Sequence, residues 1–215
     1  MASSQRRAKA VAAIKKRGAL LVYPINNRKE PRSIWSELFP RTKMRWEWDD
    51  EGDSKVADLW HLREQLSRSR QVVYSKWYQG RATFFANDVF THLVALFSGP
   101  VEMGIESRLA LEVLEADSPL STKQLKAACE LEGRLLEPTY NRALKPLWQR
   151  MKIVAFGEFE DSSFPSLGIA ATRTIFEELY NEAANISREQ AYSFLEGRLG
   201  VENPFYKFAR KISQP

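Results

Sequence analysis

The stretch "YSKWYQGRATFF", residues 74–85, places five aromatic side chains and two cations around Gln79-Gly80. Glycine readily adopts the positive φ that a two-residue turn needs, so this pattern predicts a β-hairpin closed by Gln79-Gly80. Pairing outward from the turn sets Tyr78 opposite Arg81 and Tyr74 opposite Phe85. Because side chains alternate between the faces of a strand, one face would collect Val73, Ser75, Trp77, Ala82 and Phe84, and the other Tyr74, Lys76, Tyr78, Arg81, Thr83 and Phe85.

The second of these faces combines cations with phenols, a composition suited to phosphate contacts and to stacking on bases. We therefore name Lys76, Tyr78 and Arg81 as candidate DNA-binding residues, together with Arg68 and Arg70 just before the hairpin. An ordinary amphipathic hairpin also has a polar face, which is the structural alternative. A one-residue slip in register would exchange the two faces.

Helical patterns surround the hairpin. Residues 4–17, 33–38, 54–69 and 87–97 are expected to be helices, and the first stops at Gly18, a typical C-terminal cap. The cluster "SGP" at 98–100 interrupts the helical pattern, and a similar order of elements follows it. Helices are expected over 105–116, after Ser121, which forms a capping box with Gln124, and over 138–151. A strand, a turn and a second strand then follow. Three helices followed by two strands is the order of a winged helix-turn-helix.

The sequence thus predicts an α+β, mainly α fold of two tandem winged helix-turn-helix units. The first unit would span residues 1–98 and the second residues 99–183. The C-terminal helices in residues 184–215 would pack on the core, one of them starting at Ser187 with Gln190 completing a capping box.

The third helix of the second unit, "PTYNRALKPLWQRM", is a second candidate surface. Its buried stripe would be Tyr140, Ala143, Leu144, Leu147 and Met151. Asn141, Arg142, Lys145 and Gln149 fall on the opposite side, and these residue types read base edges and phosphates from a recognition helix. Pro146 within the helix, and Glu158, Glu160 and Asp161 on the following strands, argue against close DNA contact. A homodimer or a protein partner bound through this half is the alternative.

Charge is distributed unevenly along the chain. The net charge is +5, but residues 1–98 carry 18 Lys and Arg against 10 Asp and Glu, while residues 99–215 carry 14 against 17. A polyanionic partner should therefore meet the first half. The cations of the N-terminal segment, Arg6, Arg7, Lys15, Lys16 and Arg17, would add sequence-independent affinity through counterion release, or would form only a solvated helix face.

The motifs of cofactor and metal enzymes are missing. The chain has one cysteine, Cys129, two histidines without ligands at metal-binding spacing, and no glycine-rich phosphate loop. The acidic run "WEWDDEGD", 46–53, does not have the ligand spacing of an EF-hand. We expect no cofactor, no metal and no catalytic residue. No apolar run is long enough to span a bilayer, so we expect a cytoplasmic protein without a membrane partner.

Spaced aromatic motifs give the chain a family resemblance. "VYPIN", "SIWSELFP", "RWEWDD", "ADLWHLREQL" and "VVYSKWYQGRATFF", followed by "GIESRLALEVLEADSPLSTKQLKAA" and "YNRALKPLWQRMKIVAFGEFE", cover roughly residues 18–180. This pattern resembles small bacterial winged-helix proteins related to the AlkZ-like DNA glycosylases, which unhook interstrand crosslinks. The resemblance implies a tandem winged-helix fold and a link to DNA repair. It does not carry catalysis across, because the Gln-x-Gln motif of those glycosylases is absent from the sequence.

The expected function is therefore binding of double-stranded DNA by a winged-helix protein that is linked to DNA repair and has no recognisable catalytic motif. Two alternatives stay open. One is a glycosylase-like, lesion-processing enzyme that uses a different catalytic group. The other is a protein–protein interaction scaffold, which exposed tryptophans would favour, since five of the six lie in residues 35–77.

Overall fold

A six-stranded antiparallel sheet organises the chain. The computed structural model describes residues 3–45, 54–100, 102–161 and 164–214. The strands are β1 (Ala19–Leu21), β2 (Val73–Tyr78), β3 (Arg81–Phe85), β4 (Leu120–Ser121), β5 (Ile153–Phe159) and β6 (Ser166–Ala171), in the order β1-β3-β2-β5-β6-β4. The two halves of the chain meet where β2 pairs with β5, with Tyr74 opposite Ala155.

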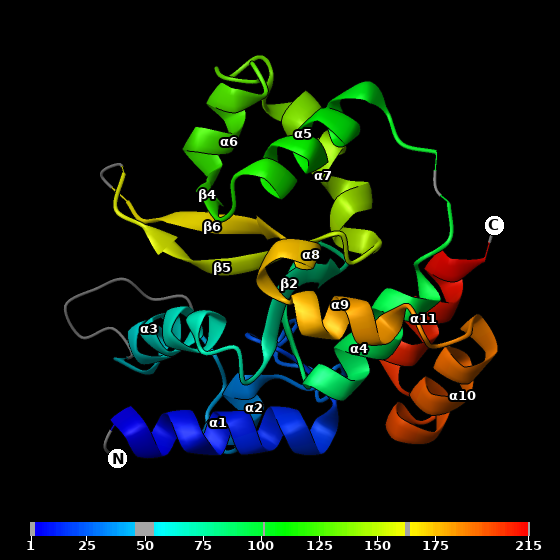
Figure 1. The fold of residues 1–215 in the computed structure, drawn as a ribbon. Coiled ribbons are helices and arrows are strands. Elements are labelled where there is room, and N and C mark those ends of the chain that lie inside the picture. The colour runs from blue at the N-terminus through cyan, green and yellow to red at the C-terminus, as the bar shows by residue number, and fades with distance from the viewer. Residues whose placement is uncertain (1–2, 46–53, 101, 162–163, 215) are drawn as a thin grey trace.

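Eleven helices in the described residues cover this sheet (Figure 1). They are α1 (Ser3–Arg17), α2 (Ile34–Leu38), α3 (Ser54–Arg68), α4 (Asn87–Leu96), α5 (Ile105–Ala116), α6 (Thr122–Ala128), α7 (Glu137–Gln149), α8 (Thr172–Ile175), α9 (Glu177–Ala183), α10 (Arg188–Leu199) and α11 (Pro204–Ser213). The prediction of an α+β, mainly helical fold is confirmed. Helices followed by two strands occur in each half, but the strands of both halves belong to one sheet.

Successive residues of the strands enter two different hydrophobic cores, because helices cover both faces of the sheet. The larger core, beneath α1–α3 and α5–α7, takes Leu20, Tyr74, Phe84, Ile153, Ala155 and Ile169. The tail-side core, beneath α4 and α8–α11, takes Leu21, Val73, Phe85, Val154 and Ala170. The C-terminal helices therefore cover one face of the sheet and pack against the tail-side core.

The predicted hairpin turn is confirmed, and most of the predicted pairing is wrong. Gln79 and Gly80 have φ values of 53° and 74°, and Tyr78 pairs with Arg81. Beyond that pair the register shifts by one residue, so that β2 has two residues opposite Ala82 and Tyr74 pairs with Phe84. Such a β-bulge twists the strand and changes which face its side chains reach.

The bulge removes the expected face of cations and phenols. Tyr74 stacks on Phe84 with ring centroids 4.8 Å apart and is 2% exposed. Tyr78 is 7% exposed and lies in the tail-side core beside Trp77. The predicted alternation assumed one face in solvent, whereas here both faces are buried. Only Lys76 and Arg81 among the candidates on the hairpin are exposed.

Local signals in the sequence correctly located several helix ends. Gly18 has φ 80°, and its N–H donates to Ile14 O at 2.8 Å, which closes α1. Ser121 and Ser187 form the predicted capping boxes with Gln124 and Gln190. These are short-range hydrogen bonds within four residues, so the sequence alone suffices to predict them.

Two glycine-to-alanine substitutions should change stability in opposite directions. Gly80→Ala places a side chain at positive φ in the hairpin turn and should lower the free energy of unfolding by about 1 kcal/mol. Gly197→Ala lies within α10, where a Cβ meets no atom within 4 Å, and should raise it by about 0.5–1 kcal/mol. Urea denaturation of both variants checks this. Equal changes in the free energy of unfolding of the two variants would show that the backbone conformation at the substituted glycine does not determine the effect.

Candidate nucleic-acid interface

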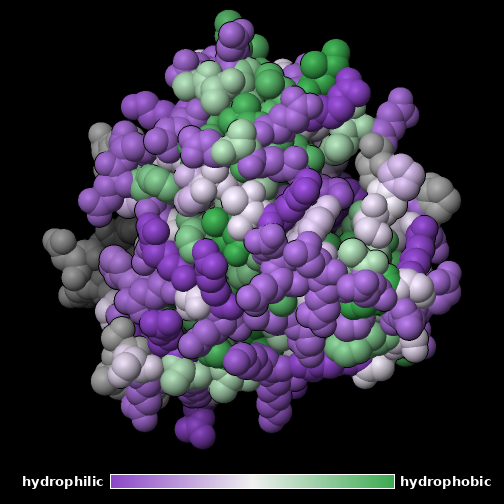
Figure 2. Space-filling model, in the orientation of Figure 1, coloured by the Kyte–Doolittle hydropathy of each residue, from purple (hydrophilic) through white to green (hydrophobic). Residues whose placement is uncertain are grey.

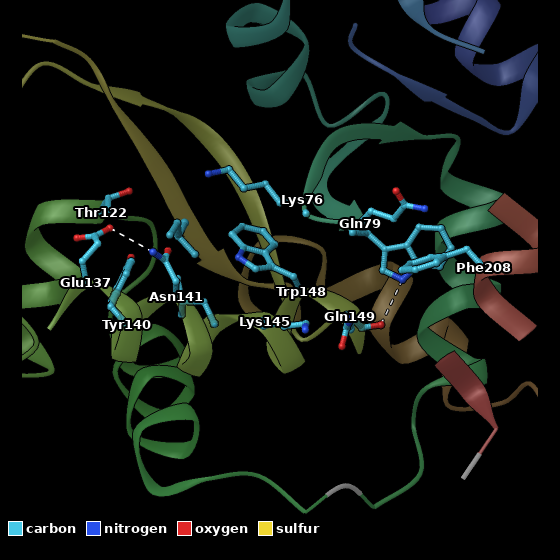
Figure 3. A pocket seen from close by; sticks show the side chains of 14 residues that line it. Lys76, Gln79, Thr122, Glu137, Tyr140, Asn141, Lys145, Trp148, Gln149 and Phe208 are labelled. Atoms are coloured by element: carbon cyan, nitrogen blue, oxygen red, sulfur yellow. Dashed lines mark hydrogen bonds between the residues drawn. The ribbon is translucent and has the colours of Figure 1, made fainter. Parts of the chain in front are cut away.

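A groove of about 640 Å³ runs between the β2–β3 hairpin and α7. The hairpin contributes Lys76, Trp77, Gln79 and Gly80, and α7 contributes Glu137, Tyr140, Asn141, Leu144, Lys145, Trp148 and Gln149. Thr122, Ile169 and Phe208 complete the lining, as Figure 3 shows. Four residues predicted as DNA contacts, Lys76, Asn141, Lys145 and Gln149, thus lie in one groove although the sequence assigned them to separate units.

Contacts of Trp77 hold the hairpin against α7. Its indole N–H donates to Gln149 O at 3.2 Å, and its ring meets Phe208 of α11 edge-on at 4.9 Å. The bulge buries both Ser75 and Trp77 and leaves Lys76 between them exposed. The sheet irregularity that made the register prediction wrong therefore directs the Lys76 amine into the groove.

Helix α7 lines the groove both with exposed polar side chains and with side chains that belong to the larger core. Asn141, Arg142 and Lys145 are exposed and Gln149 is half-buried, whereas Tyr140 and Trp148 are buried. All five residues of the predicted stripe are buried, so that prediction is confirmed, and the helix continues through Pro146 to Gln149. Within the described residues, neither Lys76 nor Lys145 forms an ion pair.

One carboxylate, that of Glu137, also lines the groove. It forms an ion pair with Lys126 and accepts a hydrogen bond of 3.4 Å from the Asn141 amide. Its charge is thus compensated by a neighbour. Lys76 and Lys145, which form no ion pair within the described residues, therefore make the net charge of the groove positive. An excess of positive charge beside amide donors is the combination that binds phosphate.

The hydroxyl of Tyr140 is buried and lies near the Thr122 hydroxyl, but not close enough or well enough aligned for a well-formed hydrogen bond. The residue is 3% exposed, and burial raises the pKa of its phenol well above the ordinary value, partly offset by the Thr122 hydroxyl. The phenol therefore stays protonated at neutral pH. A buried hydroxyl with only so weak a partner costs free energy.

The ammonium of Lys76 has an altered pKa. Partial desolvation by the surrounding protein lowers its pKa, and the positive charge of Arg63 lowers it further. Both effects disfavour the charged form of an amine. Although the side chain is exposed, a larger fraction of Lys76 is neutral than of a freely solvated lysine.

Five predicted contact residues lie outside this groove, among them Arg81, Arg142 and Tyr78. Arg81 lines an adjoining cavity of about 500 Å³ on the other side of Gly80, and Arg142 lines one of about 460 Å³ that also includes Lys145. Tyr78 is enclosed by Phe205 and Phe208, each at 5.1 Å, so the expectation that it presents a phenol for stacking is wrong.

The two arginines before the hairpin contact β5 instead. Arg68 forms an ion pair with Glu64, donates to Glu158 O at 2.7 Å and lies against Gly157. Arg70 lies 5.8 Å from the Phe156 ring centroid. Arg68 therefore joins α3 to the second half of the sheet.

Wing carboxylates were expected to repel phosphate, and two of the three are engaged internally. Glu158 forms an ion pair with Arg63. Asp161 accepts hydrogen bonds from Ser121 and Ser166, which lower its pKa. The repulsion expected from this wing is thus reduced for these two groups, and Glu160 is exposed.

The basic N-terminal segment is partly neutralised. Arg6 pairs with Asp58 at 2.7 Å and Arg17 with Glu37 at 3.1 Å. Arg7, Lys15 and Lys16 form no ion pair within the part of the chain that the structure describes. This segment retains a positive surface on α1, away from the residues that line the groove.

Sequence reasoning missed three parts of the groove: the Trp148 ring, the Tyr140 hydroxyl and Phe208. Trp148 and Tyr140 were visible as members of an amphipathic helix, but their position beside the hairpin depends on long-range strand pairing. Phe208 lies on α11, and nothing local relates that helix to residue 77. The acidic run at residues 46–53 lies outside the described residues.

Other classes of site find no support in the described ranges. Among residues 3–45, 54–100, 102–161 and 164–214, no three His, Cys, Asp or Glu side chains gather where they could hold a metal ion. Over the same ranges, each helix is too short or too polar to cross a bilayer.

Comparison with known proteins relates nearly the whole chain to one family. No curated protein matches the chain, and no solved structure matches it. Residues 5–204 match the family described as AlkZ related. The match extends through both halves of the sheet and reaches the start of α11, so the chain is a member of the AlkZ-related family.

Proposed function

We propose that this chain is a winged-helix protein of DNA repair that binds duplex DNA through the groove between the β2–β3 hairpin and α7. The observation that carries the proposal is the meeting of Lys76 with Asn141, Lys145 and Gln149 in one groove. In this proposal each half is a winged-helix unit, and the two units share one sheet. The protein would act in the cytoplasm.

The order and exposure of the elements in the second half support this function. Helices α5, α6 and α7 precede the strands β5 and β6, as in a winged helix-turn-helix, which makes α7 the recognition helix. With 13 residues, α7 is about 20 Å long, enough to lie along a major groove. Its exposed amides and cations suit base edges and phosphates, while Lys76 would contact the backbone from the hairpin.

Family membership supports the same conclusion, because the family is defined by its relation to AlkZ. AlkZ-like glycosylases act on damaged DNA, so a relative that binds duplex DNA keeps the shared substrate. The absence of the Gln-x-Gln motif from the sequence favours recognition over base excision. Release of a base from an alkylated duplex by the purified chain would instead assign a lesion-processing activity.

Salt dependence is the direct test. Fluorescence anisotropy with a labelled duplex should show binding whose log–log salt slope is about −4, since Lys76, Arg81, Arg142 and Lys145 each release counterions. Lys145→Met should reduce the magnitude of that slope by about 1. An affinity that does not change with salt concentration, or no binding at low salt, would contradict the proposal.

A protein partner is the second candidate, favoured by one observation. Large apolar side chains are exposed on α5 and in the connection before α7, among them Ile105 at 71% and Leu135 at 93%. Figure 2 shows hydrophobic atoms at this end of the molecule. In contrast, Trp35 and Trp77 are buried and Trp60 is half-buried, while Trp46 and Trp48 lie outside the described residues. Sedimentation equilibrium of Leu135→Ser against the unchanged chain would test a homodimer through this half.

A further inference from the structure

We propose that Lys76 forms a covalent imine with the ring-opened sugar of an abasic site in DNA. The chain would thereby capture, and in turn cleave, a strand that has lost a base. This inference rests on the proposed function, because the groove must first hold DNA. It adds an electrophilic substrate, an aldehyde, and a nucleophile, the Lys76 amine, to a site so far described only by its non-covalent contacts.

The position of Lys76 suits a nucleophile. The side chain lines the groove, is exposed and has no ion pair within the described residues. Figure 3 shows it extending away from the hairpin and past the Trp148 ring. Buried neighbours on both sides, Ser75 and Trp77, fix the backbone from which it projects. The amine is therefore accessible to a ligand and is held on a rigid strand.

The surroundings also favour the reactive form of the amine. Only the unprotonated amine attacks a carbonyl, and lysines become nucleophiles where desolvation or a nearby cation lowers their pKa. Both causes act on Lys76, namely partial desolvation by the surrounding protein and the charge of Arg63. The ion pair with Glu158 holds the Arg63 guanidinium in place.

The chemistry of DNA selects the electrophile. Intact nucleotides carry no aldehyde, and the carbonyls of their bases are amide-like and unreactive toward amines. Loss of a base lets the deoxyribose ring open to an aldehyde at C1′. It also removes the group that would otherwise separate C1′ from the wall of the groove. An abasic sugar is therefore the nucleic-acid electrophile that this amine can meet.

The reaction balances without an oxidant or a reductant. The Lys76 nitrogen bonds to C1′, and the adduct loses water to form the imine. Water removes a proton from C2′, the C3′–O bond breaks, and the 3′ oxygen leaves with the phosphate of the next nucleotide. Hydrolysis of the imine then returns the amine of Lys76 and releases the unsaturated aldehyde.

Borohydride trapping tests the inference, because it reduces an imine to a stable amine. The full chain is mixed with a duplex that contains one abasic site, and borohydride is added. The unchanged chain should give a covalent protein–DNA adduct whose peptide map places the modification at Lys76. Lys76→Arg keeps the positive charge and should give no adduct at duplex concentrations that saturate the variant, as anisotropy verifies. Lys29→Arg, at an exposed lysine that does not line the groove, should retain the adduct.

Each result leads to a different conclusion. An adduct lost only in Lys76→Arg supports the inference. An adduct at another amine, or no adduct from a chain that binds the abasic duplex, overturns it and leaves DNA binding intact. Failure of the unchanged chain to bind any duplex at low salt overturns the proposed function itself, and the inference with it.

Discussion

The double substitution Lys76→Glu with Lys145→Glu should raise the Kd for an undamaged duplex at least about 100-fold at low salt. These two residues supply the groove's uncompensated positive charge, because its carboxylate, Glu137, is already paired with Lys126. Reversing both charges removes two phosphate contacts and adds two repulsive ones on facing walls. Anisotropy titrations at one fixed salt concentration measure the effect.

A charge-matched control distinguishes the effect of the groove residues on DNA affinity from the effect of the protein's net charge. Arg108→Glu with Arg173→Glu changes the net charge by the same amount at exposed positions that do not line the groove. This variant should bind nearly as well as the unchanged chain. If the two double variants lost equal affinity, DNA binding would be a property of net charge, and the assignment of the interface to the groove would be wrong. Urea unfolding of both variants verifies that they are folded.

The turn and the helix ends could be predicted because each depends on a few neighbouring residues. Gly80 permits the turn, Gly18 ends α1, and Ser121 and Ser187 cap their helices through bonds within four residues. The polar side of α7 followed from helical spacing alone. All of these features were recognisable without knowing what packs against them.

Strand register could not be predicted in the same way. The bulge that shifts β2 depends on burial of both faces of the sheet, and the second face is covered by helices from the distant C-terminus, where Phe205 and Phe208 enclose Tyr78. Pairing of Tyr74 with Ala155 brings α7 beside the hairpin. The candidate site was thus predicted as two separate surfaces, and long-range pairing joined them.

A buried ion pair reinforces that junction. Arg63 on α3 bonds to Glu158 on β5, and their side chains are only 11% and 10% exposed. The guanidinium also lies 3.9 Å from the centre of the Trp60 ring, while its Nε has no partner in the described structure. Close by, Gly157 N donates to Ser67 Oγ at 2.9 Å. Helix α3 of the first half is thus joined to strand β5 of the second half.

Removing one member of this pair should have a large effect on stability. Glu158→Ala leaves the charge of Arg63 buried without a counterion, and we expect the free energy of unfolding to fall by about 3–5 kcal/mol. Glu30→Ala disrupts the exposed pair with Arg32 and should cost less than about 1 kcal/mol. Urea denaturation of the two variants gives both values.

The double variant Arg63→Met with Glu158→Leu shows whether an unpaired charge causes the loss. It removes both charges and replaces them with apolar side chains, so most of the stability lost in Glu158→Ala should return. If the double variant were as unstable as Glu158→Ala, packing around Trp60 would matter more than charge. If Glu158→Ala were as mild as Glu30→Ala, the junction would be held by the pairing of β2 with β5 and by the two cores alone. The expected pattern, a large single loss that the double variant reverses, follows from the burial of this ion pair where the two halves meet.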